Sequence, residues 1–140
     1  MSKKMLQTLA LALPALTAAY FAAPYALAQS NSAFRMPSGN IACAVFDNTL
    51  RCDLRENQAK LPPQPASCDL DWGNAFEMGV KAKPGRICHG DTVFGDYPVL
   101  GYGKTWKHKG FVCVSEAKGL TCKNATKRGW FLNKVEQKLF

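Results

Sequence analysis

The stretch that decides the fold is FRMPSGNIACAVFDNTLRCDL, residues 34–54. Its two cysteines, Cys43 and Cys52, are separated by eight residues. Antiparallel pairing of Cys43 with Cys52 leaves Asp47-Asn48 as a two-residue turn, and both residue types tolerate the positive φ that such turns require. The spacing therefore predicts a β-hairpin that is closed by a disulfide.

The same spacing recurs near the other end of the chain, in FVCVSEAKGLTC, residues 111–122. Pairing of Cys113 with Cys122 leaves a four-residue loop, residues 116–119, which ends at Gly119. A glycine suits a left-handed backbone position at the end of such a loop. The repeat predicts a second hairpin with its own disulfide.

The chain has six cysteines, all of them after residue 28. An even number in an exported chain favours a disulfide framework. The two hairpins use four cysteines, which leaves Cys68 to pair with Cys88. Structural zinc sites usually contain cysteines two to four residues apart, and no such pair exists in the sequence. We therefore predict three disulfides, and neither a metal nor another cofactor.

The N-terminus has the features of a secretory signal peptide. Two lysines precede an apolar run over residues 5–27, which two prolines interrupt and which ends in Ala26-Leu27-Ala28. A membrane anchor is the alternative, but the prolines and the small-residue cleavage site disfavour it. The pattern predicts a signal peptide, 1–28, a single β-domain, 29–140, a secreted or periplasmic location, and membrane contact only before cleavage.

Short alternating segments separated by turn-forming residues fill the rest of the chain. Only residues 133–140 are compatible with a helical period. Residues 55–67 contain three prolines and are expected to be irregular. The pattern predicts an all-β fold, a small disulfide-stapled sandwich or barrel of short antiparallel strands. The expected strands are 34–36, 41–46, 50–54, 76–80, 86–89, 104–106, 110–115 and 130–132, with one or two more short strands around residues 96–98 in the segment 91–103.

Basic residues are concentrated in the C-terminal third. The formal net charge of the chain is +8, and the part from Tyr97 onward contains nine basic residues but only two acidic ones. A basic surface can attract an anionic envelope component or an acidic protein; a solvated face that only keeps the protein soluble is the alternative. Aromatic residues among the lysines can serve as apolar anchors, although aromatics more often fill a core. The candidate binding residues are Lys104, Trp106, Lys107, Lys109, Lys127, Arg128 and Trp130.

The sequence offers little support for catalysis. His89 stands two residues before Asp91, so a base and a carboxylate are neighbours. A histidine-based hydrolase also needs a nucleophile, but no serine lies in a glycine-flanked elbow and every cysteine is assigned to a bridge. We predict instead that Asp91 accepts backbone N–H bonds in the turn after Cys88. No catalytic residue is predicted.

The second acidic motif, Asp69-Leu70-Asp71, does not continue as a calcium loop. Such a loop starting at Asp69 needs an oxygen-bearing side chain at its fifth position and a glutamate at its twelfth, where the chain has Gly73 and Val80. A glycosidase cleft is too large for this domain, so we interpret the two carboxylates as turn caps.

Six segments in this order resemble an uncharacterised family of small secreted bacterial domains of unknown function. They are FRMPSGNIAC, LRCDL, SCDLDWG, CHGDT, the pair Tyr102-Gly103, and FVCVSEAKGLTCKN followed by RGWFLNK. The resemblance implies export, paired cysteines and an all-β fold, with no established activity. Members often have glycine-histidine-glycine-phenylalanine in the last strand, where this chain has Lys127-Arg128-Gly129-Trp130. Because Arg128 replaces that histidine, no catalytic histidine is carried over.

Taken together, these observations predict an exported, non-catalytic β-domain that binds a partner or an envelope component. Two alternatives stay open. One is an inhibitor of a secreted hydrolase, for which a small and rigid domain is suitable. The other is a small hydrolase that uses His89 and Asp91.

Overall fold

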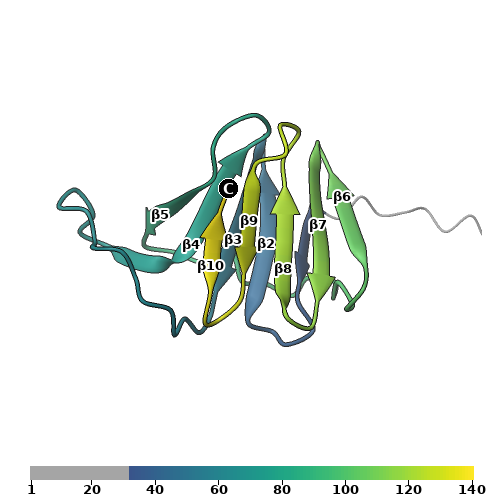
Figure 1. Ribbon diagram of the computed structural model, residues 1–140, viewed down its shortest axis with the longest axis horizontal. Helices are drawn as coiled ribbons and strands as arrows, with labels where there is room; N and C mark the ends of the chain where they lie inside the picture. The colour runs from purple at the N-terminus through teal and green to yellow at the C-terminus, as the bar shows by residue number, and fades with distance from the viewer. Residues whose placement is uncertain (1–31) are drawn as a thin grey trace, which may run out of the picture.

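The computed structural model describes residues 32–140, so the expected signal peptide and its cleavage site lie outside the described residues. Ten strands form two five-stranded antiparallel sheets (Figure 1). The first sheet contains β1 (Ala33–Arg35), β2 (Ile41–Phe46), β3 (Thr49–Leu54), β4 (Asp71–Gly79) and β5 (Gly85–His89). The second contains β6 (Thr105–His108), β7 (Phe111–Glu116), β8 (Gly119–Lys123), β9 (Gly129–Leu132) and β10 (Gln137–Leu139).

Each sheet is a meander in which neighbouring strands are consecutive in the chain. The order is β1-β2-β3-β4-β5 in one sheet and β10-β9-β8-β7-β6 in the other, and the sheets pack face to face (Figure 1). The prediction of an all-β fold of short antiparallel strands is confirmed, and of the two predicted architectures, sandwich and barrel, the structure has the two-sheet sandwich. Residues 133–140, which were compatible with a helical period, contain β10 instead. The described part of the chain contains no helix long and apolar enough to cross a membrane.

The three predicted disulfides are present. Cys43 lies opposite Cys52, and Cys113 opposite Cys122, with Cα atoms 4.1 Å apart in both pairs. This short separation is typical of directly opposed residues on adjacent antiparallel strands. The third bridge joins Cys68 to Cys88, with Cα atoms 5.6 Å apart.

One of the two hairpin turns differs from expectation. Asp47 has a φ of 53°, as the first turn requires. In the second hairpin Glu116 still pairs with Gly119, so the connection has two residues and not four. Gly119 keeps a positive φ of 153° inside the strand, and a Cβ there would lie 2.7 Å from the carbonyl oxygen of Leu132. The glycine thus permits β8 to approach β9 closely.

The core is built from equivalent positions of the two sheets. The Phe34 ring, opposite Cys43, lies 4.9 Å from the Trp106 ring, which stands opposite Cys113. Between these positions the two hairpin disulfides meet, because sulfur atoms of both bridges lie within 4.8 Å of one another. Equivalent residues therefore contact each other, which is the arrangement of two repeated halves related by an approximate two-fold rotation. The same relation holds for Phe76 and Trp130, opposite Cys52 and Cys122, whose ring centroids are 6.2 Å apart.

The connection between the sheets, residues 90–104, runs across the outer face of the first sheet. It contains no strand, contrary to expectation, and forms only an isolated bridge between Val99 and Arg35. Val93 is buried there with Ala33 and Ala44. Farther along, Arg35 donates its backbone N–H to the carbonyl of Pro98, and Leu100 donates to the carbonyl of Arg35. This covering segment buries the outward side chains of β3, which would otherwise face solvent.

Candidate functional site

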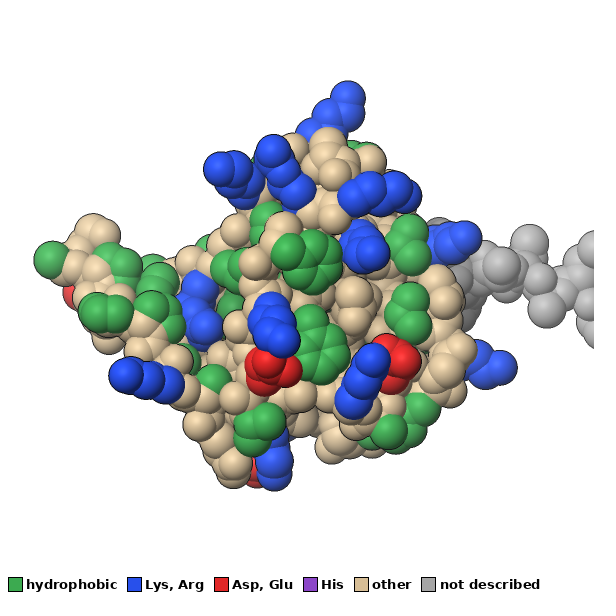
Figure 2. Space-filling model, in the orientation of Figure 1, with side chains coloured by type: hydrophobic (Ala, Val, Ile, Leu, Met, Phe, Trp, Pro, Cys, Tyr) green, Lys and Arg blue, Asp and Glu red, His purple; other side chains and the backbone are tan. Residues whose placement is uncertain are grey.

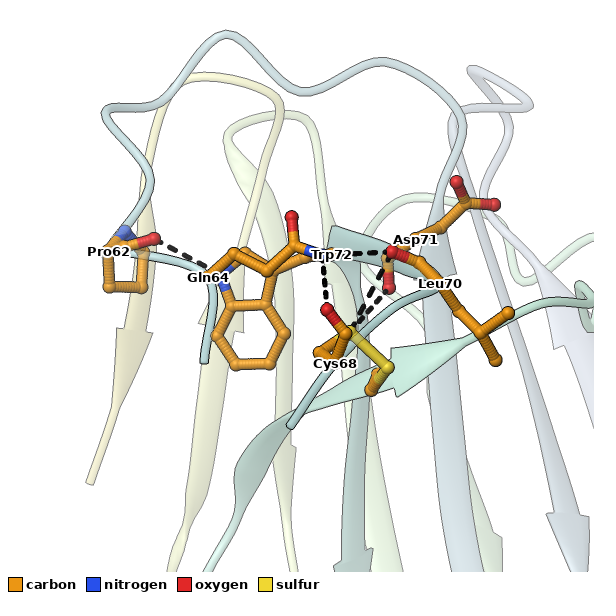
Figure 3. The surroundings of a disulfide bond; sticks show 7 residues. Pro62, Gln64, Cys68, Leu70, Asp71 and Trp72 are labelled. Carbon is orange, nitrogen blue, oxygen red and sulfur yellow. Dashed lines mark hydrogen bonds between the residues drawn. A yellow bond between two sulfur atoms is a disulfide. The ribbon is translucent and has the colours of Figure 1, made fainter. Parts of the chain in front are cut away.

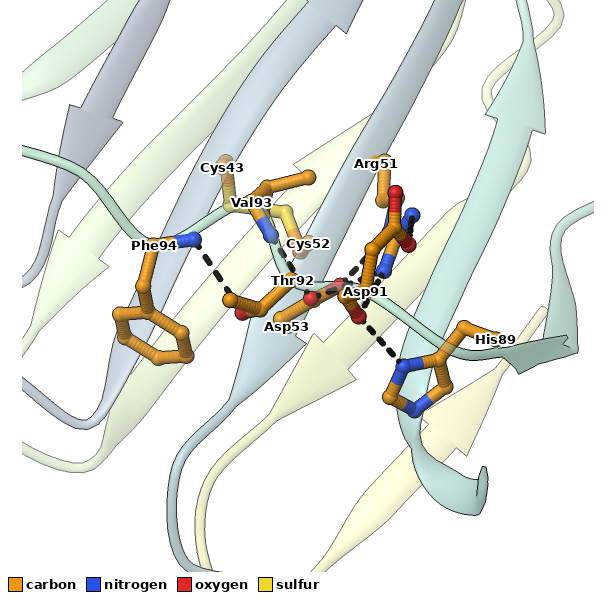
Figure 4. A network of polar contacts seen from close by, with 9 residues as sticks. All are labelled: Cys43, Arg51, Cys52, Asp53, His89, Asp91, Thr92, Val93 and Phe94. Carbon is orange, nitrogen blue, oxygen red and sulfur yellow. Dashed lines mark hydrogen bonds and ion pairs between the residues drawn. A yellow bond between two sulfur atoms is a disulfide. The ribbon is translucent and has the colours of Figure 1, made fainter. Parts of the chain in front are cut away.

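Beneath the covering segment lies a charged network that contains Asp91 (Figure 4). Arg51 donates from Nε and Nη2 to the two carboxylate oxygens of Asp53 at 2.9 and 3.0 Å, and from Nη1 to Asp91 at 2.9 Å. Asp53 also accepts the backbone N–H of Val93 at 3.0 Å. The carboxylate of Asp91 accepts from Arg51, a partner that the sequence did not predict, and the backbone N–H of Val93 in the same turn donates to Asp53.

The network shifts the pKa values of Arg51 and Asp91 in the directions that favour their charged forms. The hydrogen bond from Arg51 holds the pKa of Asp91 below its ordinary value. Burial alone would lower the pKa of Arg51, because it disfavours the charged guanidinium. Hydrogen bonds to Asp53 and Asp91 outweigh this effect and raise the pKa of Arg51. Both partners stay charged at neutral pH, as a structural ion pair requires.

His89 does not contact the carboxylate of Asp91. Its Nδ1 lies 2.8 Å from the backbone carbonyl oxygen of Asp91, while Nε2 is buried without a hydrogen-bond partner among the described residues (Figure 4). A base oriented by a carboxylate, as in hydrolase triads, needs a direct bond between the two side chains. The geometry instead ties the imidazole to the main chain next to the Arg51 network.

A second candidate site is the end of the sandwich that holds the β2–β3, β4–β5, β6–β7 and β8–β9 turns. Contacts between the sheets bring these turns together: Lys109 donates to the carbonyl of Asp47 at 3.0 Å, and Ala125 donates to that of Val80 at 3.0 Å. We call this the basic end. Its exposed basic residues are Lys81, Lys83, Lys109, Lys123, Lys127 and Arg128, and the acidic residue in its turns is Asp47.

Figure 2 shows the same asymmetry on the surface. Lys and Arg side chains gather at the upper end of this view, where the β8–β9 turn lies in Figure 1, whereas basic and acidic side chains lie next to each other farther down. A field of one sign over one end attracts an anionic partner more strongly than the same charges spread evenly.

Asn124 holds two of the basic turns in place. It is 3% exposed, and its Nδ2 donates to the carbonyls of Gly79 and Ala82 at 2.9 and 2.7 Å. Its Oδ1 accepts the backbone N–H of Thr126 at 3.0 Å. One buried amide thus links the β8–β9 turn to the β4–β5 turn, so the charges of both are presented together.

The structure brings together only some of the predicted binding residues. Lys109, Lys127 and Arg128 belong to the basic end, and Lys107 is exposed on β6 just before it. Lys104 precedes β6 and lies toward the opposite end. Trp130 is 0% exposed, and the expectation that it could be a surface anchor is wrong because the ring fills the core beside Phe76. Trp106 is half-buried against the core.

Sequence reasoning missed Lys81, Lys83 and Lys123. Lys81 and Lys83 stand in the β4–β5 turn of the first sheet, far from the basic C-terminal third. The repeated hairpin gave no signal for this arrangement, because the corresponding turns of the two halves, β2–β3 and β7–β8, lie at opposite ends of the sandwich. Next to Lys83 and Arg128, a hollow of about 210 Å³ is also lined by Pro84, Leu139 and Phe140.

A third feature is an arm, residues 59–70, which protrudes from the side of the sandwich before β4 (Figures 1 and 3). The Cys68–Cys88 disulfide ties it to β5. The Nε2 of Gln64 donates to the carbonyls of Cys68 and Leu70 at 2.8 and 3.1 Å. These bonds fix the shape of a segment that has no regular secondary structure.

Apolar side chains of the arm face solvent. Leu70 is 55% exposed and Leu61 is 39% exposed, and Figure 2 shows apolar atoms at the projecting end. Trp72 turns toward the arm and donates its Nε1 hydrogen to the carbonyl of Pro62 at 3.1 Å. A rigid apolar projection of this kind is suited to insertion into a cleft of another protein.

Comparisons with curated proteins and with solved structures give no match. A comparison with models of protein families does give a match, and it covers most of the expected signal peptide and the whole sandwich. It includes both hairpins, the covering segment and the basic end. The model of the family of unknown function DUF6636 matches residues 6–140, and the chain therefore belongs to that family.

Proposed function

We propose that this protein is an exported, non-catalytic domain that binds an anionic component of the bacterial cell envelope through its basic end. The observation that carries the proposal is the convergence of six exposed basic residues from both sheets around a single acidic one. If these charges only kept the protein soluble, they would not need to gather at one end of the fold. Three disulfides are consistent with an oxidising extracellular or periplasmic location.

The size of the surface favours an extended partner with several negative charges. The cations come from three separate turns and the end of β8, so one small anion cannot contact all of them. Exposed charges are screened beyond about 10 Å at 0.1 M ionic strength. Binding should therefore weaken as salt rises, and it should depend on several cations at once.

The double variant Lys127→Glu, Arg128→Glu should bind lipopolysaccharide about 30-fold or more weakly at low salt. Each basic residue near an anionic membrane surface contributes about 1 kcal/mol, so the loss of two contributes about 2 kcal/mol before repulsion is counted. Titration of lipopolysaccharide at two salt concentrations measures the effect, with single-stranded DNA and an acidic protein as alternative partners.

The matched control is Lys60→Glu, Lys104→Glu, which makes the same change in net charge away from the basic end. This control should bind within about threefold of the wild type, because Lys60 belongs to the irregular segment before β4 and Lys104 lies toward the opposite end of β6 from the basic turns. Equal weakening in both double variants would indicate a nonspecific charge effect and would reject the basic end as the site.

The arm favours a second candidate function, inhibition of a secreted hydrolase. A projection that is already rigid loses little entropy when it binds in an enzyme cleft. We expect the protein to slow at least one of subtilisin, chymotrypsin and lysozyme, and the Leu70→Asp variant to lose this effect because it places a charge in the apolar contact. If the wild type inhibits none of the three enzymes, this candidate is rejected.

A further inference from the structure

A hollow with a volume of about 560 Å³ lies at the end opposite the basic end. Four segments and Tyr102 form its walls. These segments are the β1–β2 turn, the chain just after β3, the β7–β8 turn and the start of the β9–β10 turn. Small-molecule sites are usually clefts of roughly 300–1,000 Å³, so the hollow has the size of a ligand site.

Hydrogen bonds between the segments fix two of the walls. Asn40 and Glu56 exchange two bonds, since Asn40 Nδ2 donates to the Glu56 carbonyl at 3.2 Å and the Glu56 N–H donates to Asn40 Oδ1 at 2.7 Å. On the other side, Asn133 Nδ2 donates to the carbonyl of Lys118 at 2.9 Å. Preformed walls of this kind reduce the entropy cost of binding.

The charges around the hollow favour an anion. Arg55, Lys118 and Lys134 line it, against one carboxylate, Glu56. The Arg55 guanidinium is positioned 4.4 Å from the ring centre of Phe94, and Lys118 Nζ lies 3.6 Å from a carboxylate oxygen of Glu116. Lys134 is exposed, and within residues 32–140 its ammonium group forms neither a hydrogen bond nor an ion pair. It can therefore bind a ligand charge without breaking an existing contact.

The remaining lining combines polar groups with apolar surface and includes one aromatic ring. Tyr102 is 47% exposed, so its ring and hydroxyl can contact a ligand. Met36 and Ile41 also line the hollow and are 3% and 2% exposed. Ser38 and backbone groups of the turns supply further hydrogen-bonding groups. A hydroxylated ring matches this mixture, because it can stack on Tyr102 and form hydrogen bonds with the polar rim.

We infer that this hollow is a binding site for an acidic sugar, a monosaccharide or disaccharide that carries a carboxylate or a phosphate. The sugar ring packs on Tyr102, and its acidic group lies near Lys134 and Lys118. The site is separate from the basic end, so each can bind when the other is disabled.

The test is an NMR titration of the ¹⁵N-labelled protein with galacturonate, glucose 6-phosphate, glucose and acetate. At least one acidic sugar should shift the amides of residues 38–40, 102–103, 117–119 and 133–134, and should bind about five- to tenfold more tightly than glucose, as one or two exposed ion pairs allow. A response to galacturonate identifies a carboxylate ligand, and a response to glucose 6-phosphate identifies a phosphorylated one.

Two variants locate the site. Ala117→Trp places a large ring in the hollow and should abolish these shifts, whereas Ala125→Trp, in an exposed turn at the basic end, should leave them unchanged. Lys134→Glu should reduce binding of the acidic sugar to the level of glucose. The inference is overturned if neither acidic sugar binds more tightly than glucose, if acetate binds as well as the sugars, or if Ala117→Trp binds like the wild type.

Discussion

The Asp53→Ala variant is expected to lower the free energy of unfolding by about 3–5 kcal/mol. Asp53 is 2% exposed and binds two nitrogens of Arg51, whose side chain is 9% exposed. Removing the carboxylate leaves a buried guanidinium with half of its partners and also leaves the Val93 N–H without its acceptor. Urea denaturation followed by tryptophan fluorescence measures the loss.

The control for this prediction is Asp91→Ala. Asp91 binds the same guanidinium at 2.9 Å, but its side chain is 80% exposed. Water can replace it, so the expected loss is that of a surface ion pair, about 0–1 kcal/mol. A double variant, Arg51→Met with Asp53→Leu, should recover most of the stability lost in Asp53→Ala, because apolar pairs often replace buried ion pairs at little cost. Similar losses for Asp53→Ala and Asp91→Ala would contradict the assignment of Asp53 as the buried partner.

The burial of this network could not be predicted from the sequence. Strand alternation correctly places Cys52 and Leu54 on the inner face of β3 and thus assigns Arg51 and Asp53 to the outer face. An outer face ordinarily meets solvent, and alternation along one strand carries no information about a distant segment. The covering segment 90–104 buries that face. Arg51 and Asp53 therefore form a buried ion pair, although their positions in the sequence are typical of surface charges.

The hairpins could be predicted because their signals are local. Two cysteines at a fixed spacing around turn-forming residues determine both the register and the bridge, and the structure has the predicted pairs. The basic end and the hollow depend on interactions between distant segments, for example Asn124 with Gly79 and Asn40 with Glu56. Such interactions join residues 16 to 45 positions apart, and a single sequence gives no periodic signal for them.

The double variant Cys113→Ala, Cys122→Ala is expected to lower the free energy of unfolding more than the double variant Cys68→Ala, Cys88→Ala. Loss of either bridge raises the conformational entropy of the unfolded chain, which lowers the free energy of unfolding by about 3 kcal/mol in the chain-entropy model. The loss is slightly larger for Cys68–Cys88, which closes the longer loop. The difference comes from packing. Cys113 and Cys122 are both 0% exposed and face the other hairpin disulfide, whereas Cys88 is exposed beside the arm.

Removal of the core sulfurs should therefore add about 1–2 kcal/mol, because a small cavity replaces two well-packed atoms in the centre of the sandwich. The total, about 4–5 kcal/mol, is a large fraction of the stability of a small domain. Denaturation of both double variants under the same conditions separates the two contributions, because loop length and burial predict opposite orders. A larger loss for the Cys68–Cys88 pair would mean that chain entropy outweighs packing, and that the contact between the two hairpin disulfides contributes little to holding the sheets together.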